Sequence, residues 1–454
     1  MKKIFQYIML AVVTIVMASC TSDIEETTAA TGKNNVQLVV GEFPAFGDSQ
    51  TRAIGTTDPG KTSWAEGDEL LLVMTSKTLG TKYATFKYNG SSWELASGEL
   101  SYKEDEVPTF PHVYYAPNYK WEAGTLVLKE GKVAGTDEYI EGTAQITPNG
   151  QSITVKFAEA TRNYSRLRIA TLPNEQITVD TEDFTPAGSS DKIWGRNYAL
   201  TSDEKGNAYL YGTFEIDSEV TVKYRESSLT TYIFSQATES AKSYALDATV
   251  ISANSAEEIK SAIKQEVADG KTAIRLNLAS DAGDNEFNAI REAFEKVQEG
   301  TIDLTLIGCK EIPANGLNNQ SGGLEALKSI TLPDVTKIGK NALLFCVDLE
   351  EICAPNVSAI DECAFKGCYH LKKVTLGELT DVRGEANSGG GIFGVTDTGD
   401  LNIDLYLPKN QEVMEFDENQ YIWKPTGESY FASPEDYDNG IFLGYKFKSV
   451  KSWE

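Results

Sequence analysis

Two hydrophobic patterns divide the chain, and the change between them falls at residue 251. Upstream, apolar residues recur at every second position in short runs separated by turn-forming residues, which is typical of strands with one buried face. In "YATFKYNGSSWEL" the alternation stops at Asn89-Gly90, a pair that favours the primed two-residue turn of a β-hairpin. The absence of a helical period predicts all-β domains, which we interpret as β-sandwiches over residues 36–158 and 159–250.

From residue 251 the apolar period lengthens to that of a helix. Ser255 and Glu258 form a capping-box sequence, which predicts a helix that ends before Gly270. A second helix is predicted from about Asn285, and a short alternating strand follows each helix. Two helix–strand units over residues 251–307 suit the cap of a longer solenoid.

A repeat with a period of 22 residues begins at residue 327. "LKSITLPDVTKIGKNALLFCVD" is followed by "LEEICAPNVSAIDECAFKGCYH" and then by "LKKVTLGELTDVRGEA", each starting with leucine. This period lies within the range of leucine-rich repeats, and the pattern "LP…IG..AF..C..L" resembles the BspA-like (Treponema pallidum type) leucine-rich repeats. The resemblance implies an α/β solenoid of such repeats over residues 308–410, closed by a C-terminal cap over 411–454.

The cysteines of the repeat invite a different interpretation, because Cys353, Cys363, Cys368 and His370 look like a zinc ligand set. A zinc site needs ligands that converge on one point, whereas the period places these residues on different faces of the coil. Cys346 and Cys368 are 22 residues apart, so they are expected at the same inward position of neighbouring coils. A disulfide between them is sterically conceivable, and two buried thiols are the favoured alternative. We expect no metal.

The outward strand positions of the repeats form a candidate ligand face, because solenoids bind partners on extended concave surfaces. For any one position, an ordinary solvated side chain is an equally good explanation. The face consists of Ser329, Thr331, Glu351, Cys353, Lys373, Thr375, Asp404 and Tyr406.

The N-terminus begins "MKKIFQYIMLAVVTIVMASC", with two lysines before an apolar stretch of signal-peptide length. Its end, Met17 to Cys20, resembles a bacterial lipobox. The resemblance implies a signal peptide over residues 1–19, acyl chains such as palmitate on Cys20 and anchoring to the outer membrane, with residues 20–35 as a tether. The acidic cluster from Asp23 to Glu26 resembles the surface-export signal of Bacteroidetes lipoproteins. An ordinary signal peptide and a solvated charge run are the alternatives.

Four motifs of the β-rich part resemble the fimbrillin-like proteins of Bacteroidetes. They are "TRA" at 51–53, "W..GD" at 64–68, "F.Y.G..W" at 86–93 and "YYAPN" at 114–118. The resemblance implies transthyretin-like β-sandwiches and, in polymerising members, cleavage after an arginine, here Arg52, that opens a groove for a donor strand. About 200 residues of helix and repeat follow these domains, whereas a stalk subunit needs a free C-terminal donor strand. A tip or accessory subunit therefore fits better.

Charge and composition exclude several function classes. The net charge is −26 and no basic stripe occurs, so a nucleic-acid partner is not expected. Only His112 and His370 are available for a Ser/His/Asp triad. "DAGDNE" (281–286) and "PEDYDNG" (434–440) offer oxygen ligands for calcium but lack EF-hand spacing. We expect neither enzymatic activity nor a cofactor.

Together these patterns predict a lipid-anchored adhesin on the cell exterior. Its fimbrillin-like domains would present the repeats to a host or bacterial surface protein or glycan, and other fimbrial subunits are further candidate partners. The alternative is a glycan-binding lipoprotein of a polysaccharide-uptake system.

Overall fold

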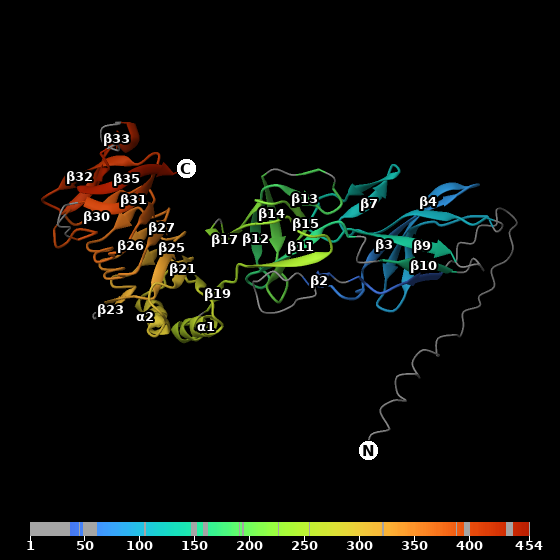
Figure 1. The fold of residues 1–454 in the computed structure, drawn as a ribbon, viewed down its shortest axis with the longest axis horizontal. Helices are drawn as coiled ribbons and strands as arrows, with labels where there is room; N and C mark the ends of the chain where they lie inside the picture. The colour runs from blue at the N-terminus through green and yellow to red at the C-terminus, as the bar shows by residue number, and fades with distance from the viewer. Residues whose placement is uncertain are drawn as a thin grey trace, which may run out of the picture. The chain divides into compact units, whose positions relative to one another are not determined.

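Strands make up most of the regular structure in a computed structural model of the chain, and two α-helices occur among the described residues (Figure 1). Cys20, the acidic cluster after it and Arg52 lie outside the described residues. The structure describes residues 37–44, 46–48, 61–103, 106–146, 152–157, 162–189, 191–192, 195–225, 227–253, 255–319, 322–386, 388–394, 400–432 and 439–453.

Contacts between residues divide the chain into two units. The first combines residues up to Glu42 with Ala65–Tyr114 and Gly142–Lys156, and the second combines Phe43–Trp64, Tyr115–Glu141 and Phe157–Glu454. The second unit therefore includes both the later β-rich segment and the repeats. The individual domain boundaries expected from the sequence stay predictions.

One seven-stranded sheet forms the first unit. Its strands at the two ends of the order, β1 and β5, approach within 8 Å between Cα atoms, so the sheet curls back on itself. Leu72, Phe86, Val113 and Ile153 are buried on its inner face. The strand order is β1 (Gln37–Val40), β10 (Ser152–Lys156), β9 (Ile140–Ile146), β6 (Thr109–Tyr115), β3 (Glu69–Ser76), β4 (Gly80–Tyr88) and β5 (Trp93–Gly98).

The hairpin between β4 and β5 is confirmed, but the predicted two-residue turn is wrong. Tyr88 pairs with Trp93, so four residues form the loop. The Asn89 side-chain oxygen accepts hydrogen bonds from the backbone N–H groups of Ser91 and Ser92 at 3.0 and 2.8 Å. Within the loop the Asn89 backbone N–H donates to the Ser92 carbonyl at 3.0 Å, and Gly90 alone has a positive φ, at 94°. The tip therefore lies at Gly90 and Ser91, not at the expected Asn89-Gly90 pair.

Two further sheets share one buried core in the second unit. Leu167 and Leu210 from one sheet and Val179 and Val220 from the other belong to a single apolar cluster, so the sheets form two layers. The first sheet has the order β13 (Phe184–Pro186), β15 (Asn207–Phe214), β11 (Ser165–Ala170), β18 (Lys242–Asp247) and β2 (Gly47–Asp48). The second has the order β14 (Arg196–Thr201), β12 (Gln176–Thr181), β16 (Glu219–Tyr224) and β17 (Ser227–Ile233), and β7 (Tyr119–Glu122) and β8 (Thr125–Leu128) form a separate hairpin.

A buried ion pair lies beside the segment that precedes β2. Arg162 and Glu138 are 3.2 Å apart, with side chains 0% and 5% exposed. Arg162 also donates to the Pro44 carbonyl at 2.5 Å, and its guanidinium carbon lies 4.1 Å from the centroid of the Phe46 ring. The Tyr164 hydroxyl donates to the second Glu138 oxygen at 2.7 Å. This network holds the segment around Phe46 against the two-layered core.

Both predicted helices are confirmed. Ser255 accepts a hydrogen bond from the Glu258 backbone N–H at 3.4 Å and begins α1 (Ala256–Ala268), which buries Ile259 and Ile263. Helix α2 (Asp284–Phe294) buries Phe287, Ile290 and Phe294. The strand that follows each helix, β20 (Ala273–Asn277) or β21 (Ile302–Ile307), enters the sheet of the repeats.

The repeats build a solenoid with two sheets. In the nine-stranded sheet, Ile330 pairs with Ile352, Ile352 with Val374, and Val374 with Leu405, which confirms the 22-residue step for the first two. Its order is β19 (Ile251–Ser252), β20, β21, β25 (Leu327–Thr331), β27 (Glu351–Ala354), β29 (Lys373–Leu376), β31 (Asp400–Pro408), β35 (Tyr445–Trp453) and β34 (Ile441–Phe442). The other sheet has the order β22 (Glu311–Ile312), β26 (Lys337–Ile338), β28 (Ala359–Ile360), β30 (Asp381–Arg383), β33 (Ile422–Ser429) and β32 (Glu412–Asp417).

Short elements complete the solenoid. β23 (Asn318–Asn319) and β24 (Gly322–Gly323) form a small hairpin, and η2 (Tyr430–Ala432) is a 3₁₀ turn. Strand β35 lies parallel to β31. The segment expected as a C-terminal cap therefore also supplies a strand of the main sheet.

Candidate functional site

The eight residues predicted as a ligand face form two rows across β25, β27, β29 and β31. Ser329, Glu351, Lys373 and Asp404 are aligned in one row. Thr331, Cys353, Thr375 and Tyr406 are aligned in the other. Neighbouring strands of a sheet lie about 4.8 Å apart, so residues far apart in sequence become neighbours. We call these two aligned rows the strand face.

Both rows continue past the predicted residues. Asp303 precedes Ser329 and Ser449 follows Asp404, while Thr305 precedes Thr331 and Lys451 follows Tyr406. The sequence interpretation missed these four because they lie outside residues 308–410, the segment assigned to the repeats. The alternation in "IDLTLI" (302–307) is a signal that identifies Asp303 and Thr305 as outward residues.

The charged residues of the first row form ion pairs. Lys373 Nζ lies 2.6 Å from Glu351 Oε1, and this hydrogen bond raises the pKa of Lys373. Lys448 Nζ lies 2.7 Å from Asp404 Oδ2, and Ser449 donates to Asp404 Oδ1 at 2.5 Å. The hydrogen bonds from Lys448 and Ser449 lower the pKa of Asp404. Glu351 is therefore paired with a lysine of the same row, and Asp404 with a lysine beside the row.

The second row is less polar. The ring of Tyr406 lies near two ammonium groups, with its centroid 5.7 Å from Lys373 Nζ and 5.5 Å from Lys451 Nζ. Burial and the nearby Glu351 carboxylate raise the pKa of the Cys353 thiol. A thiol with a raised pKa stays protonated at neutral pH and is a poor nucleophile. This row therefore offers contact area rather than reactive groups.

The cysteines of "CAFKGCYH" have separate partners. Cys363 Sγ donates to the Gly389 carbonyl at 3.1 Å, and Cys368 Sγ donates to the Leu343 carbonyl at 3.2 Å. His370 Nδ1 lies 3.1 Å from Asp348. Across the described ranges, no group of three or more His, Cys, Asp or Glu side chains is placed to hold a metal ion.

The inner cysteines are free thiols. Cys346 is fully buried, as the repeat predicts, and burial raises its pKa to about 12. Cys368 is half-buried, and burial raises its pKa well above the usual value. The five described cysteines carry no disulfide, so the interpretation as two thiols holds for this pair.

The remaining candidates have structural surroundings. Within "DAGDNE", Glu286 accepts the Gly283 backbone N–H at 2.9 Å and so caps α2. His112 Nδ1 lies 3.0 Å from the Tyr114 hydroxyl. Trp64 meets Tyr115 edge-on, with the ring centroids 5.2 Å apart. Residues 433–438, which include most of "PEDYDNG", lie outside the described residues.

A family model supports the assignment of the repeats. Residues 318–388 match the BspA type leucine rich repeat region in six copies. This segment contains β25, β27 and β29, which carry six of the eight predicted face residues. No curated protein matches the chain. Within the described ranges, the longest apolar stretch of either helix falls short of what crossing a membrane requires.

Proposed function

We propose that this protein is a non-catalytic adhesin on the cell exterior, held by lipid on Cys20 in the outer membrane. The strand face binds a host or bacterial surface protein or glycan. The observation that carries the proposal is the pair of aligned outward rows on a sheet of BspA-type repeats. Parallel sheets are usually covered on both faces. Here the outward polar residues of the strands are uncovered, which suits contact with another molecule.

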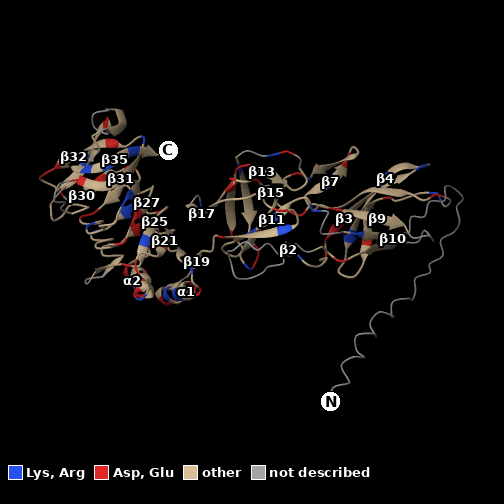
Figure 2. Ribbon diagram, viewed as in Figure 1, with Lys and Arg blue, Asp and Glu red and all other residues tan. Residues whose placement is uncertain are grey.

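The chemistry of the strand face supports binding rather than catalysis. Its carboxylates and ammonium groups are already paired, and its thiol is protonated at neutral pH. Acidic and basic side chains are interspersed along the solenoid (Figure 2). Paired charges of this kind contribute more to partner selection than to affinity.

The β-rich domains serve, in this proposal, as a fimbrillin-like stalk of transthyretin-like β-sandwiches. Their curled sheet and two-layered core support that assignment. The long segment after these domains favours a tip or accessory subunit over a stalk subunit. Cleavage after Arg52 belongs to the same proposal, and mass spectrometry of the protein shaved from intact cells tests both its surface exposure and its N-terminus.

Binding of the mature chain to matrix proteins and to a glycan array tests the strand face directly. Thr375→Arg places a long cation in the less polar row, beside Cys353 and Tyr406, so we expect at least a tenfold loss of binding. Thr426→Arg is the matched control, because Thr426 is exposed on β33 in the other sheet. Equal binding of every detected ligand by both variants would contradict the role of the strand face.

The same screen separates the two candidate functions. Binding to matrix or bacterial surface proteins supports the adhesin. Binding to oligosaccharides without binding to any protein would instead support a glycan-binding lipoprotein of a polysaccharide-uptake system.

A further inference from the structure

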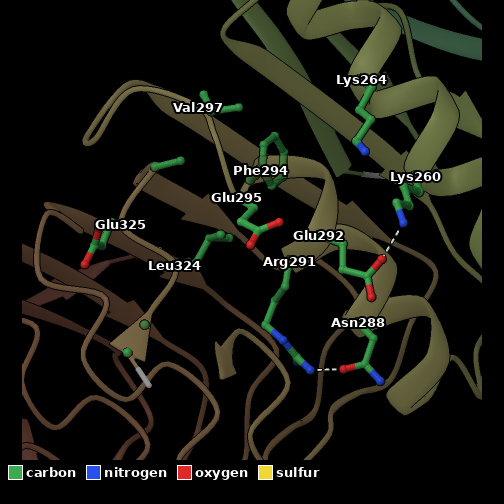
Figure 3. A pocket seen from close by; sticks show the side chains of 13 residues that line it. Lys260, Lys264, Asn288, Arg291, Glu292, Phe294, Glu295, Val297, Leu324 and Glu325 are labelled. Atoms are coloured by element: carbon green, nitrogen blue, oxygen red, sulfur yellow. Dashed lines mark hydrogen bonds and ion pairs between the residues drawn. The ribbon is translucent and has the colours of Figure 1, made fainter. Parts of the chain in front are cut away.

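A polar groove lies where α1 and α2 meet the segment before β25 (Figure 3). Its volume is about 580 Å³, within the range of about 300–1,000 Å³ that is typical of small-molecule sites. None of its residues belongs to the strand face. The lining residues are Lys260, Lys264, Asn288, Arg291, Glu292, Phe294, Glu295, Val297 and residues 322–326.

One wall of the groove is held by Arg291. Its guanidinium donates to the Asn315 carbonyl at 3.0 Å and also to the Gly316 carbonyl and the Asn288 side chain. These partners come from α2 and from the first coil of the solenoid. Because the guanidinium is fixed by three acceptors, its position is set before any ligand arrives, which reduces the ordering cost of binding.

Three charged side chains of the groove form no direct ion pair with a described residue. Lys260 is paired with Glu292. Lys264, Glu295 and Glu325, however, form no salt bridge or side-chain hydrogen bond with any residue that the structure describes. They come from α1, from the end of α2 and from the loop before β25 (Figure 3). Donors and acceptors from three segments are therefore available to a ligand in one groove.

The balance of charges indicates the class of ligand. Three cationic side chains, Lys260, Lys264 and Arg291, line the groove together with three carboxylates, those of Glu292, Glu295 and Glu325. A ligand with net charge would meet as many like charges as opposite ones. A hydroxyl group both donates and accepts hydrogen bonds, so a polyhydroxylated ligand can use both kinds of side chain.

The apolar residues of the lining argue against a peptide side chain as the anchor. Phe294, Leu324 and Ala326 are 2%, 6% and 3% exposed, so they belong to the floor and offer little surface. Val297 is partly buried against the solenoid core. Peptide recognition usually depends on an apolar anchor in a fitting pocket. We propose that this groove binds a short uncharged oligosaccharide through its free carboxylates, Lys264 and the fixed Arg291.

An array of neutral, sialylated and sulfated oligosaccharides, probed with the mature chain, tests the proposal. We expect one or more neutral oligosaccharides to bind, and calorimetry with the best of them gives the affinity. The double variant Glu295→Ala/Glu325→Ala should weaken that affinity at least tenfold. Glu428→Ala is the matched control, because Glu428 is exposed on β33 and does not line the groove.

Several results would overturn the proposal. They are the absence of binding to any neutral oligosaccharide, binding to acidic ones only, and unchanged affinity in the double variant. Glu295→Gln/Glu325→Gln keeps side-chain size and provides a second test if the alanine variant unfolds. Each amide has one acceptor oxygen where the carboxylate has two, and it carries no charge to strengthen the hydrogen bonds. An unchanged affinity would again overturn the proposal. For a ligand of the groove, Thr375→Arg should leave the affinity intact while Glu295→Ala/Glu325→Ala lowers it. For a ligand of the strand face the reverse should hold, so failure of the groove and failure of the strand face are distinguishable.

Discussion

Lys373 and Glu351 are 22 residues apart in the chain, and their charged atoms are 2.6 Å apart across two neighbouring strands. The same separation joins Lys372 to Glu350, Lys340 to Glu362 and Arg383 to Asp361. The period that aligns the buried residues therefore also aligns opposite charges on the surface, so neighbouring coils attract one another outside the core as well as inside it.

Disrupting one of these ion pairs should lower the free energy of unfolding slightly, and reversing both charges should restore most of it. Lys340 and Glu362 are 2.5 Å apart and largely exposed, and exposed pairs contribute about 0.2–1 kcal/mol. We expect Lys340→Glu to lower the free energy of unfolding by about this amount, and Lys340→Glu/Glu362→Lys to recover most of the loss. Urea unfolding followed by circular dichroism measures both. A double variant less stable than the single one would contradict the inter-coil attraction.

Breaking the buried pair should be far more damaging. Glu138→Ala leaves the Arg162 guanidinium buried without its carboxylate, which typically costs about 3–5 kcal/mol. Replacing both residues, as in Arg162→Met/Glu138→Leu, removes the uncompensated charge and should cost less than the single change. Denaturant unfolding, followed through the transition of the β-rich domains, compares the free energies of unfolding of the single and double variants. Equal destabilisation would mean that side-chain packing, rather than charge, accounts for the loss.

The Asp404 carboxylate makes the contact between β31 and β35 sensitive to acid. Hydrogen bonds from Lys448 and Ser449 lower its pKa below the ordinary value of 3.8. A group with a lowered folded-state pKa stabilises the fold above its unfolded pKa, and this stabilisation is lost as pH falls through the folded value. Wild type should therefore exceed Asp404→Asn in stability at pH 7 by an amount that shrinks below pH 3.8. Unfolding curves at pH 7 and pH 3 measure the difference, and a gap independent of pH would contradict the assignment.

Thiol modification should distinguish the outward cysteine from the inward one. Cys353 is half-buried on the strand face, whereas Cys346 is fully buried with a pKa of about 12. Both pKa values are raised, so iodoacetamide at pH 7 should react slowly with the native protein. Raising the pH should speed modification of Cys353 well before that of Cys346, as peptide mass spectrometry would show. Preferential labelling of Cys346 would mean that the coil opens more readily than its burial indicates.

Local and periodic features were predictable because their signals lie within a few residues or recur at a constant step. The Ser255 cap, the buried stripe of α2 and the 22-residue alignment of the strand face are examples. The Asn89-Gly90 turn was wrong in its position, because the dipeptide is compatible with more than one place in a hairpin loop. Here Asn89 lies before the tip, and its side chain accepts from the Ser91 and Ser92 backbone N–H groups.

What the sequence determined by itself is the repeat: its period, its buried positions and its outward rows, because each coil contacts the next at a constant separation. Only the tertiary structure decided which segments come into contact when they are not separated by a constant number of residues. Strand β35 joins β31 across 36 intervening residues (409–444), and the groove collects Lys264, Glu295 and Glu325 from three segments. Neither arrangement follows from a period, since each depends on how helices and irregular coils pack to bury the apolar ends of the solenoid.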